Sequence, residues 1–341
     1  MVVAPSAAVE ASPAHSASPR RRVFSRTVLV AAAFSLLAAF APGLPVASAS
    51  PHIVGIQRIS PQVDLVSVYS PSMHRVIRNH VLHPGGKPAG LPSFYMLPGA
   101  GGAEDGISWY HNGGAQNFFA GKRVNVVLPI GGKFSMWTDW NAPDPVLGVN
   151  KWETYINREL PPVIDAAYRT NRVKALSGVS MTAGPALDIV THAPSQWRAV
   201  ASYSGCPSAS DPPGTLANTA VVSRGGGNVA NMWGPPGSAQ WRRHDPIVNA
   251  GRLRGTAIYL SAGSGIAGPV DGSILRNGGG FVGGNVIERV SLSCTTNMSD
   301  RLNSLRIPHR FVHRRDGVHT WGLFNADLRN SWPMVAGAIG A

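Results

Sequence analysis

Apolar positions recur along this chain of 341 residues with two different periods, and segments of the two kinds alternate. Alternation at every second position is typical of half-buried strands, short apolar runs are typical of buried strands, and a period near 3.6 is typical of helices. The patterns predict strands at 63–69, 75–82, 93–97, 124–128, 197–203, 256–260 and 309–313, and a further strand that starts at Val173. They predict helices at 151–168, from 182 to about 192, at 286–305 and at 323–338.

Several elements carry a local signal of their own. Ser70-Pro-Ser72 separates the first two strands and predicts a hairpin. Pro161-Pro162 predicts that the helix over 151–168 is broken into two, and Pro333 predicts an interruption in the last helix. Residues before 63 are interpreted as a short polar lead-in.

This order of strands and helices predicts the fold class. Strands that alternate with helices form a mainly parallel sheet with helices on both faces, so the chain is predicted to be α/β. Residues 207–245 are rich in Gly, Pro, Ser and Asn and lack a strong period until Met232. We interpret them as an excursion over the active face, and residues 50–341 as a single domain.

The first 49 residues differ from the rest and predict a secretory signal peptide. Arg20-Arg-Arg22 precedes an apolar run over 28–41, and Ala47-Ser-Ala49 supplies the small residues of a cleavage site. The run is too short for a membrane-spanning helix, and Pro42 follows it directly. We therefore expect an exported protein, with Sec and twin-arginine routes both open.

The net charge of the exported part indicates which classes of partner it favours. Without the leader, the chain carries 26 basic against 16 acidic residues. Such an excess favours contact with anionic polymers or lipid headgroups of a cell envelope, although an arginine-rich composition without a specific partner gives the same count. The basic residues are scattered without interleaved aromatics, which argues against nucleic-acid binding.

The two cysteines of the sequence are Cys206 and Cys294. An exported protein with one such pair is expected to oxidise it, so we predict a disulfide, with two free thiols as the alternative.

Gly178-Val-Ser-Met181 marks the first candidate for chemistry, because an apolar run enters this sharp turn and leaves it as a helix. In α/β-hydrolases such an elbow exposes a serine hydroxyl and aims the next N–H at the developing oxyanion. This makes Ser180 the candidate nucleophile and Met181 an oxyanion donor. The alternative is a simple helix N-cap, and Thr182 stands where a second glycine is usual.

A serine nucleophile needs a histidine and a carboxylate, which follow it along the chain in this fold. His319 lies in a turn after the last strand, as expected of the base. Asp271 and Glu288 are both candidates for the acid.

Other chemistries lack their sequence signals. The loop Pro98–Ala103 is glycine-rich but has no Walker ending, so we expect no nucleotide cofactor, and a backbone N–H near Ala100 is instead a candidate second oxyanion donor. No His-x-x-x-His with a glutamate and no Cys-x-x-Cys pair occurs, so we expect no metal.

Several short motifs between about Val63 and Trp332 occur together in a characteristic order. They are Ser70-Pro-Ser-Met73, Leu128-Pro-Ile-Gly-Gly132, Trp137-Thr-Asp-Trp140, Lys151-Trp-Glu-Thr154, Glu159-Leu-Pro161, Gly178-Val-Ser-Met181, Met232-Trp-Gly-Pro235, Asn285-Val-Ile-Glu288 and Gly317-Val-His-Thr-Trp321. Through them the chain resembles the antigen 85 mycolyltransferases and their relatives, which are secreted α/β-hydrolase-fold esterases. The family's elbow also lacks the second glycine.

The resemblance implies roles for individual residues. It makes Ser180 the nucleophile, His319 the general base and Glu288, in preference to Asp271, the orienting acid. The oxyanion donors become the N–H groups of Met181 and Ala100. A disulfide from Cys294, six residues beyond Glu288, to Cys206 would hold the helix that carries the acid.

The resemblance also implies the reaction. Ser180 would take a long acyl chain from a trehalose mycolate ester and pass it to a hydroxyl of an acceptor sugar, lipid or protein in the cell envelope. Pro98 and Gly101 stand where trehalose-binding relatives have an aspartate and an arginine, so the acceptor site differs, and Glu104 or Asp105 are candidate replacements. The alternatives are a carboxylesterase that uses water and a family member that binds the envelope without catalysis.

Overall fold

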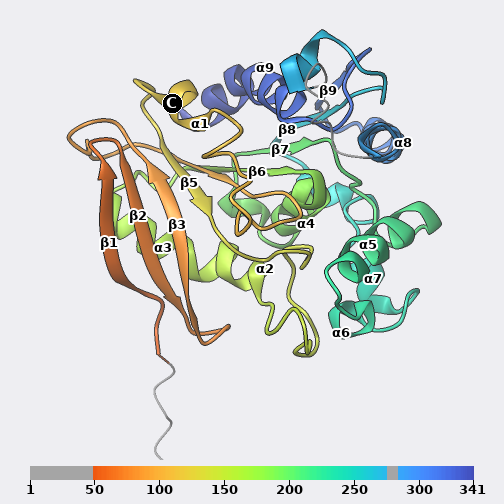
Figure 1. The fold of residues 1–341 in the computed structure, drawn as a ribbon, viewed down its shortest axis with the longest axis horizontal. Helices are drawn as coiled ribbons and strands as arrows, with labels where there is room; N and C mark the ends of the chain where they lie inside the picture. The colour runs from red at the N-terminus through yellow and green to blue at the C-terminus, as the bar shows by residue number, and fades with distance from the viewer. Residues whose placement is uncertain (1–48, 275–282) are drawn as a thin grey trace, which may run out of the picture. The chain divides into compact units, whose positions relative to one another are not determined.

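Nine strands form one mixed sheet in the order β1-β2-β3-β5-β4-β6-β7-β8-β9 in the computed structural model (Figure 1). The structure describes residues 49–274 and 283–341, so residues 1–48 of the predicted signal peptide lie outside the described residues. The strands are β1 His52–Ser60, β2 Val63–Ser70, β3 Arg75–Leu82, β4 Ser93–Met96, β5 Asn125–Pro129, β6 Lys174–Val179, β7 Ala199–Tyr203, β8 Ala257–Ala262 and β9 Arg310–His313.

The sheet has an antiparallel and a parallel part. Strands β1, β2, β3 and β5 pair antiparallel, and β2 and β3 form the predicted hairpin, in register from Val63 opposite Leu82 to Ser70 opposite Arg75. From β5 onward, β4, β6, β7, β8 and β9 pair parallel. The predicted mainly parallel sheet is confirmed. Its parallel part places the carboxyl ends of β4, β6, β7 and β8 along one edge, where such folds build their sites.

Helices cover both faces of the sheet (Figure 1). Those longer than five residues are α3 Leu160–Tyr168, α4 Ala183–His192, α5 Pro212–Arg224, α8 Gly284–Ser304 and α9 Trp321–Ile339. Successive strand residues point to opposite faces. Val127 of β5 therefore belongs to the core on one face, with residues of α3, α4 and α8, whereas its neighbours Val126 and Leu128 belong to the core on the other face, with residues of α9 and the short α1 Ala115–Phe119.

The expected polar lead-in before residue 63 is wrong, because β1 occupies His52–Ser60. This strand lies at the edge of the sheet and most of its residues are exposed, including Val54 and Ile56 at 50% and 47%. A strand exposed on both sides needs no apolar alternation, so hydrophobic periodicity does not reveal it.

The excursion after β7 holds the helices α5, α6 Val229–Trp233 and α7 Ala239–Arg243, which the sequence analysis did not predict. The composition hides α5, but its start carries a recognisable signal. Asp211 caps it by accepting a hydrogen bond from the Gly214 N–H at 2.7 Å, and prolines occupy its first positions. Met232 and Trp241 from this segment are buried in the core on the α4 face.

The predicted helix breaks at proline do not occur. The chain stays helical from Trp152 to Tyr168, with α2 Trp152–Thr154 and a π-helical stretch Tyr155–Glu159 leading into α3. Pro161 and Pro162 lie at the start of α3, where a missing N–H is tolerated. Helix α9 continues through Pro333, because buried residues on both sides of it hold the helix against β6, β7 and β8.

Candidate active site

Ser180 lies at the sharp turn between β6 and α4. The turn is a short 3-10 helix, Ser180–Thr182, and Ser180 adopts a left-handed backbone conformation with φ of 56°. Few residues other than glycine adopt this conformation, so the surrounding structure must hold it. Glycines make the turn possible: a Cβ at Gly178 would overlap the carbonyl oxygen of Thr182, and one at Gly205 would overlap that of Ser180.

Thr182 ties this elbow to the loop after β4. Its buried hydroxyl accepts a hydrogen bond from the Val179 N–H at 3.0 Å and donates one to the Pro98 carbonyl at 2.8 Å. A glycine here could make neither contact. The residue that departs from the usual elbow pattern therefore fixes the loop that faces Ser180.

His319 reaches Ser180 from the loop between β9 and α9. Its Nε2 lies 2.8 Å from Ser180 Oγ, and its Nδ1 lies 2.7 Å from Glu288 Oε2. His319 also has a left-handed backbone, with φ of 64°, and its ring contacts Phe324 edge-on. The three side chains thus form one continuous chain of hydrogen bonds from carboxylate to hydroxyl.

Glu288 enters from the first part of α8 and is completely buried. Its second oxygen, Oε1, accepts hydrogen bonds from Ser204 Oγ at 2.8 Å and from the Gly263 N–H at 2.6 Å. A buried carboxylate is costly unless such donors surround it. These two donors come from the ends of β7 and β8 and fix the carboxylate in the orientation that meets the imidazole.

Asp271, the other candidate acid, does not contact the His319 imidazole. Its Oδ1 accepts hydrogen bonds from the Val318 N–H at 3.0 Å and from Thr320 Oγ1 at 2.8 Å, and the residue is buried. A second hydrogen bond joins the same two segments, because the carboxylate of Asp316 accepts from the N–H of Val270, the residue before Asp271, at 3.2 Å. Asp271 thus holds the residues on both sides of His319, through the backbone of Val318 and the side chain of Thr320, a role that sequence reasoning missed.

The segments that carry the two predicted oxyanion donors both lie next to Ser180. Met181 lies in the first turn after the elbow, where N–H groups have no partner within the helix. On the other side, a Cβ built on Gly99 would lie 3.9 Å from Ser180 Cβ, so the Pro98 loop passes next to the serine. The Ala100 carbonyl accepts from the Phe134 N–H at 2.9 Å, which holds this loop in place.

The two acidic residues of this loop lie differently. A side chain at Gly101 would overlap the carboxylate of Asp105, so Asp105 fills the space beside that glycine. Asp105 is exposed and accepts a hydrogen bond from the Ile107 N–H at 3.0 Å. Glu104 instead lies beside Lys133, with its carboxylate 3.8 Å from the ammonium group.

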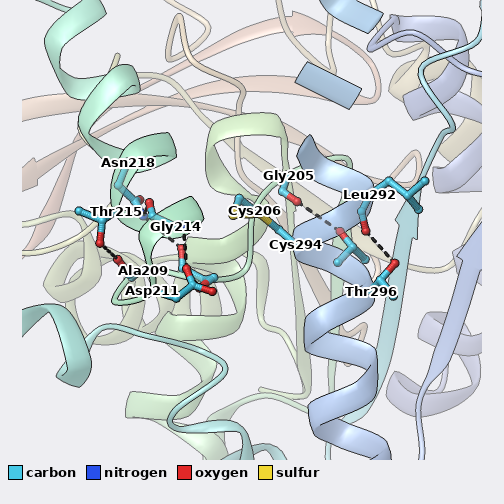
Figure 2. The surroundings of a disulfide bond; sticks show 12 residues. Gly205, Cys206, Ala209, Asp211, Gly214, Thr215, Asn218, Leu292, Cys294 and Thr296 are labelled. Atoms are coloured by element: carbon cyan, nitrogen blue, oxygen red, sulfur yellow. Dashed lines mark hydrogen bonds between the residues drawn. A yellow bond between two sulfur atoms is a disulfide. The ribbon is translucent and has the colours of Figure 1, made fainter. Parts of the chain in front are cut away.

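Cys206 and Cys294 form a disulfide, as predicted (Figure 2). The bond joins the segment after β7 to α8, the helix that carries Glu288. Next to it, Thr295 Oγ1 donates a hydrogen bond to the Gly205 carbonyl at 3.2 Å. The disulfide therefore connects the helix that carries Glu288 to the segment that packs against the serine elbow.

Comparison with known proteins agrees with this architecture. The family model described as "Putative esterase" matches residues 70–333. The diacylglycerol acyltransferase/mycolyltransferase Ag85C of Mycobacterium avium is 31% identical over 315 residues, which cover 89% of this chain and 84% of that protein. Ag85A of Mycobacterium tuberculosis is 29% identical over 287 residues, 82% of each chain.

Solved structures give the same fold. Mycobacterium tuberculosis MPT51 (FbpC1) superposes with a TM-score of 0.66 at 24% identity, over 84% of this chain and 99% of that one. An S-formylglutathione hydrolase from Agrobacterium tumefaciens superposes with a TM-score of 0.60 at 14% identity, over 85% and 100%. Among the described residues, no helix is long and apolar enough to cross a membrane. The chain thus has the α/β-hydrolase fold and belongs to the esterase family that includes the antigen 85 diacylglycerol acyltransferase/mycolyltransferases.

Proposed function

We propose that this protein is a secreted serine acyltransferase that moves a mycoloyl group from a trehalose mycolate to a hydroxyl of the cell envelope. The observation that carries the proposal is the chain of hydrogen bonds from Glu288 through His319 to Ser180, at an elbow that holds the serine in a strained conformation. Ser180, His319 and Glu288 would be its nucleophile, base and acid.

The reaction would proceed in two halves. His319 Nε2 takes the proton of Ser180 as Oγ attacks the ester carbonyl, and the oxyanion binds the N–H groups of Met181 and Ala100. His319 then protonates the leaving trehalose oxygen. In the second half, His319 takes the proton of the acceptor hydroxyl as that oxygen attacks the acyl carbonyl, and returns the proton to Ser180 Oγ as the bond from the acyl group to Ser180 breaks. Glu288 keeps the imidazole oriented and stabilises its positive charge throughout.

Of the proposed substrate sites, the acceptor site is the one in which this chain departs most from its relatives. Asp105 packs over Gly101 and offers an exposed carboxylate beside the Pro98 loop, where it could accept hydrogen bonds from a sugar hydroxyl. If Asp105 binds the acceptor, Asp105→Asn should raise the KM for the acceptor and leave the first acylation step unchanged.

Labelling with a fluorophosphonate tests the nucleophile. We expect folded wild-type protein to react at Ser180, with Ser180→Ala unlabelled and His319→Gln slowed by roughly 10²-fold or more. The matched control is Ser72→Ala, which changes a serine away from the elbow. Absence of labelling in folded protein would favour a non-catalytic envelope-binding role.

Product analysis separates transfer from hydrolysis. The protein without residues 1–49 is incubated with trehalose monomycolate, and every acylated product is identified by mass spectrometry. Transfer predicts acylated sugar, lipid or protein products that depend on Ser180. Release of free mycolic acid as the sole product would identify a carboxylesterase.

A further inference from the structure

A second group of polar side chains lies away from Ser180. It consists of Glu153 from α2, Asp188 and His192 from α4, and His244 just after α7. One ligand atom from each of the four lies within 4.8 Å of all the others. Asp188 and His244 are buried, and the side chains of His192 and Glu153 are 12% and 17% exposed. We call these four residues the His-carboxylate cluster.

The contacts within the cluster join imidazole nitrogens to carboxylate oxygens. His244 Nδ1 lies 2.8 Å from Asp188 Oδ2 and 3.7 Å from Glu153 Oε2. His192 Nδ1 lies 3.0 Å from Glu153 Oε1 and 3.9 Å from Asp188 Oδ1. In both rings, therefore, the same type of nitrogen faces the two carboxylates.

A backbone contact assigns the proton on one of these rings. His192 Nε2 lies 3.2 Å from the Arg243 carbonyl oxygen, which only accepts hydrogen bonds, so Nε2 carries the proton. When the ring is neutral, Nδ1 therefore carries a lone pair, and this lone pair faces two carboxylates. Histidines that bind metal use this arrangement, with one nitrogen on the metal and the other N–H on a backbone carbonyl.

Two buried atoms of the cluster have an incomplete set of partners among the described residues, although His192 Nδ1 lies 3.0 Å from Glu153 Oε1. Asp188 Oδ1 and His192 Nδ1 make no aligned hydrogen bond, although Asp188 is only 4% exposed. The two atoms lie 3.9 Å apart, among the carboxylates and imidazoles of the cluster. A cation there would satisfy both at once, because a buried carboxylate oxygen without a donor or a countercharge is costly.

We infer that the His-carboxylate cluster binds a zinc ion, with His192 Nδ1, His244 Nδ1, Asp188 and Glu153 as ligands. Two imidazoles and two carboxylates match the nitrogen and oxygen donors that zinc takes in tetrahedral sites. Bonds of about 2.0–2.2 Å require these atoms to be roughly 3–4 Å apart, which small side-chain rotations achieve from the observed spacing.

The position of the cluster gives the ion a structural role. It connects α2, the end of α4 and the segment after α7. Trp233 from α6 stacks on the His244 ring, with the two ring centroids 4.9 Å apart. Because α4 begins directly after the serine elbow, zinc would fix the far end of the helix that follows Ser180. No sequence motif marks this site, because its ligands come from three separate segments and only Asp188 and His192 among them share a helix.

Metal content tests the inference. Untagged wild-type protein is dialysed against excess zinc sulfate and then against metal-free buffer, and zinc is measured by mass spectrometry. We expect roughly one zinc per chain in the wild type. We expect binding weakened by about 100-fold or more in Asp188→Asn and in His244→Gln, because even outer partners of metal ligands contribute about 10–100-fold. His74→Asn, which changes an exposed histidine outside the cluster, should keep its zinc.

Two further measurements guard against misfolded variants. Zinc, but not magnesium, should raise the melting temperature of the wild type, and a chelator should reverse this, since a ligand that binds the folded state stabilises it. Cobalt(II) should give the visible spectrum of tetrahedral coordination. Wild-type protein without bound zinc and without a zinc-specific rise in melting temperature would overturn the inference, as would equal zinc content in Asp188→Asn. Fluorophosphonate labelling of Ser180 reads out the proposed function independently.

Discussion

Ser180 and His319 both have left-handed backbones, and other residues hold them in these conformations. Asp271 accepts hydrogen bonds from Val318 and Thr320, on either side of His319. Asp271→Asn replaces one acceptor oxygen by an NH₂ group and removes the charge that strengthens these bonds. A buried network that loses a partner in this way costs about 1–3 kcal/mol.

We expect Asp271→Asn to lower kcat by roughly 10-fold or more with little change in KM, because the imidazole shifts while the substrate contacts remain. Thr320→Val is the matched variant, since it removes one of the same bonds from the other side. A stability loss with unchanged labelling rate at Ser180 would reduce Asp271 to a purely structural residue.

The side-chain oxygen of Thr182 allows a second test of how the elbow and the facing loop are held. Thr182→Val keeps the shape of the side chain but leaves the Val179 N–H and the Pro98 carbonyl without their partner. We expect a loss of about 1–3 kcal/mol in urea unfolding and slower acylation, because the loop that carries Ala100 is released. Thr182→Ser keeps the hydroxyl and should behave nearly as the wild type; equal effects of the two variants would show that the methyl group matters instead.

The candidate site was partly predictable from residue patterns. The turn between a strand and a helix selects Ser180, and a position after the last strand selects His319. The acid was not decided in this way, because Asp271 and Glu288 both lie in the segment that precedes His319. Their roles depend on long-range packing, which places Glu288 opposite the imidazole and Asp271 against the backbone. The resemblance to relatives supplied that choice.

At the scale of elements, α8 carries Glu288 and is bonded to the segment after β7 by the Cys206–Cys294 disulfide. Replacing both cysteines by alanine opens a covalent loop with a sequence separation of 88 residues. The entropic model gives a loss of up to about 4.5 kcal/mol for such a loop. We also expect lower activity at temperatures where the protein stays folded, because Glu288 is held less firmly.

Urea unfolding and esterase assays on the Cys206→Ala, Cys294→Ala variant check both effects. Reduction of the wild type with dithiothreitol should reproduce them. Unchanged activity in the folded variant would contradict the link between the disulfide and Glu288.

Elements were predictable where burial imposes a period. The hairpin of β2 and β3 and the parallel strands follow from their apolar patterns, since one or both faces are covered. Strand β1 and helices α5 to α7 were not predictable from periodicity, because exposed or mixed surfaces impose no such pattern. Pro333 was overestimated as a helix breaker, because the packing of α9 on the sheet outweighs one lost hydrogen bond.

For the whole molecule, buried charges decide how stability depends on pH. Asp327 of α9 is completely buried and pairs with Arg314, whose Nε lies 2.6 Å from Oδ1. Burial outweighs this pairing and raises the pKa of Asp327 to about 6. Asp64 is equally buried, but hydrogen bonds from Lys87 and Tyr168 outweigh the effect of burial and lower its pKa.

These two carboxyl groups should act in opposite directions. Between about pH 4 and 6 the folded protein keeps a proton on Asp327 that the unfolded chain has lost, so this group stabilises the fold below pH 4 and that contribution is lost as pH rises through 6. Relative to Asp327→Asn, the wild type should therefore lose up to about 3 kcal/mol over this range. Asp64 contributes stability above about pH 4 that is lost as pH falls below it, so the advantage of the wild type over Asp64→Asn should grow with pH. Urea unfolding of the three proteins at a series of pH values measures both differences, and parallel curves for wild type and Asp327→Asn would show that Asp327 has an ordinary pKa in the folded state.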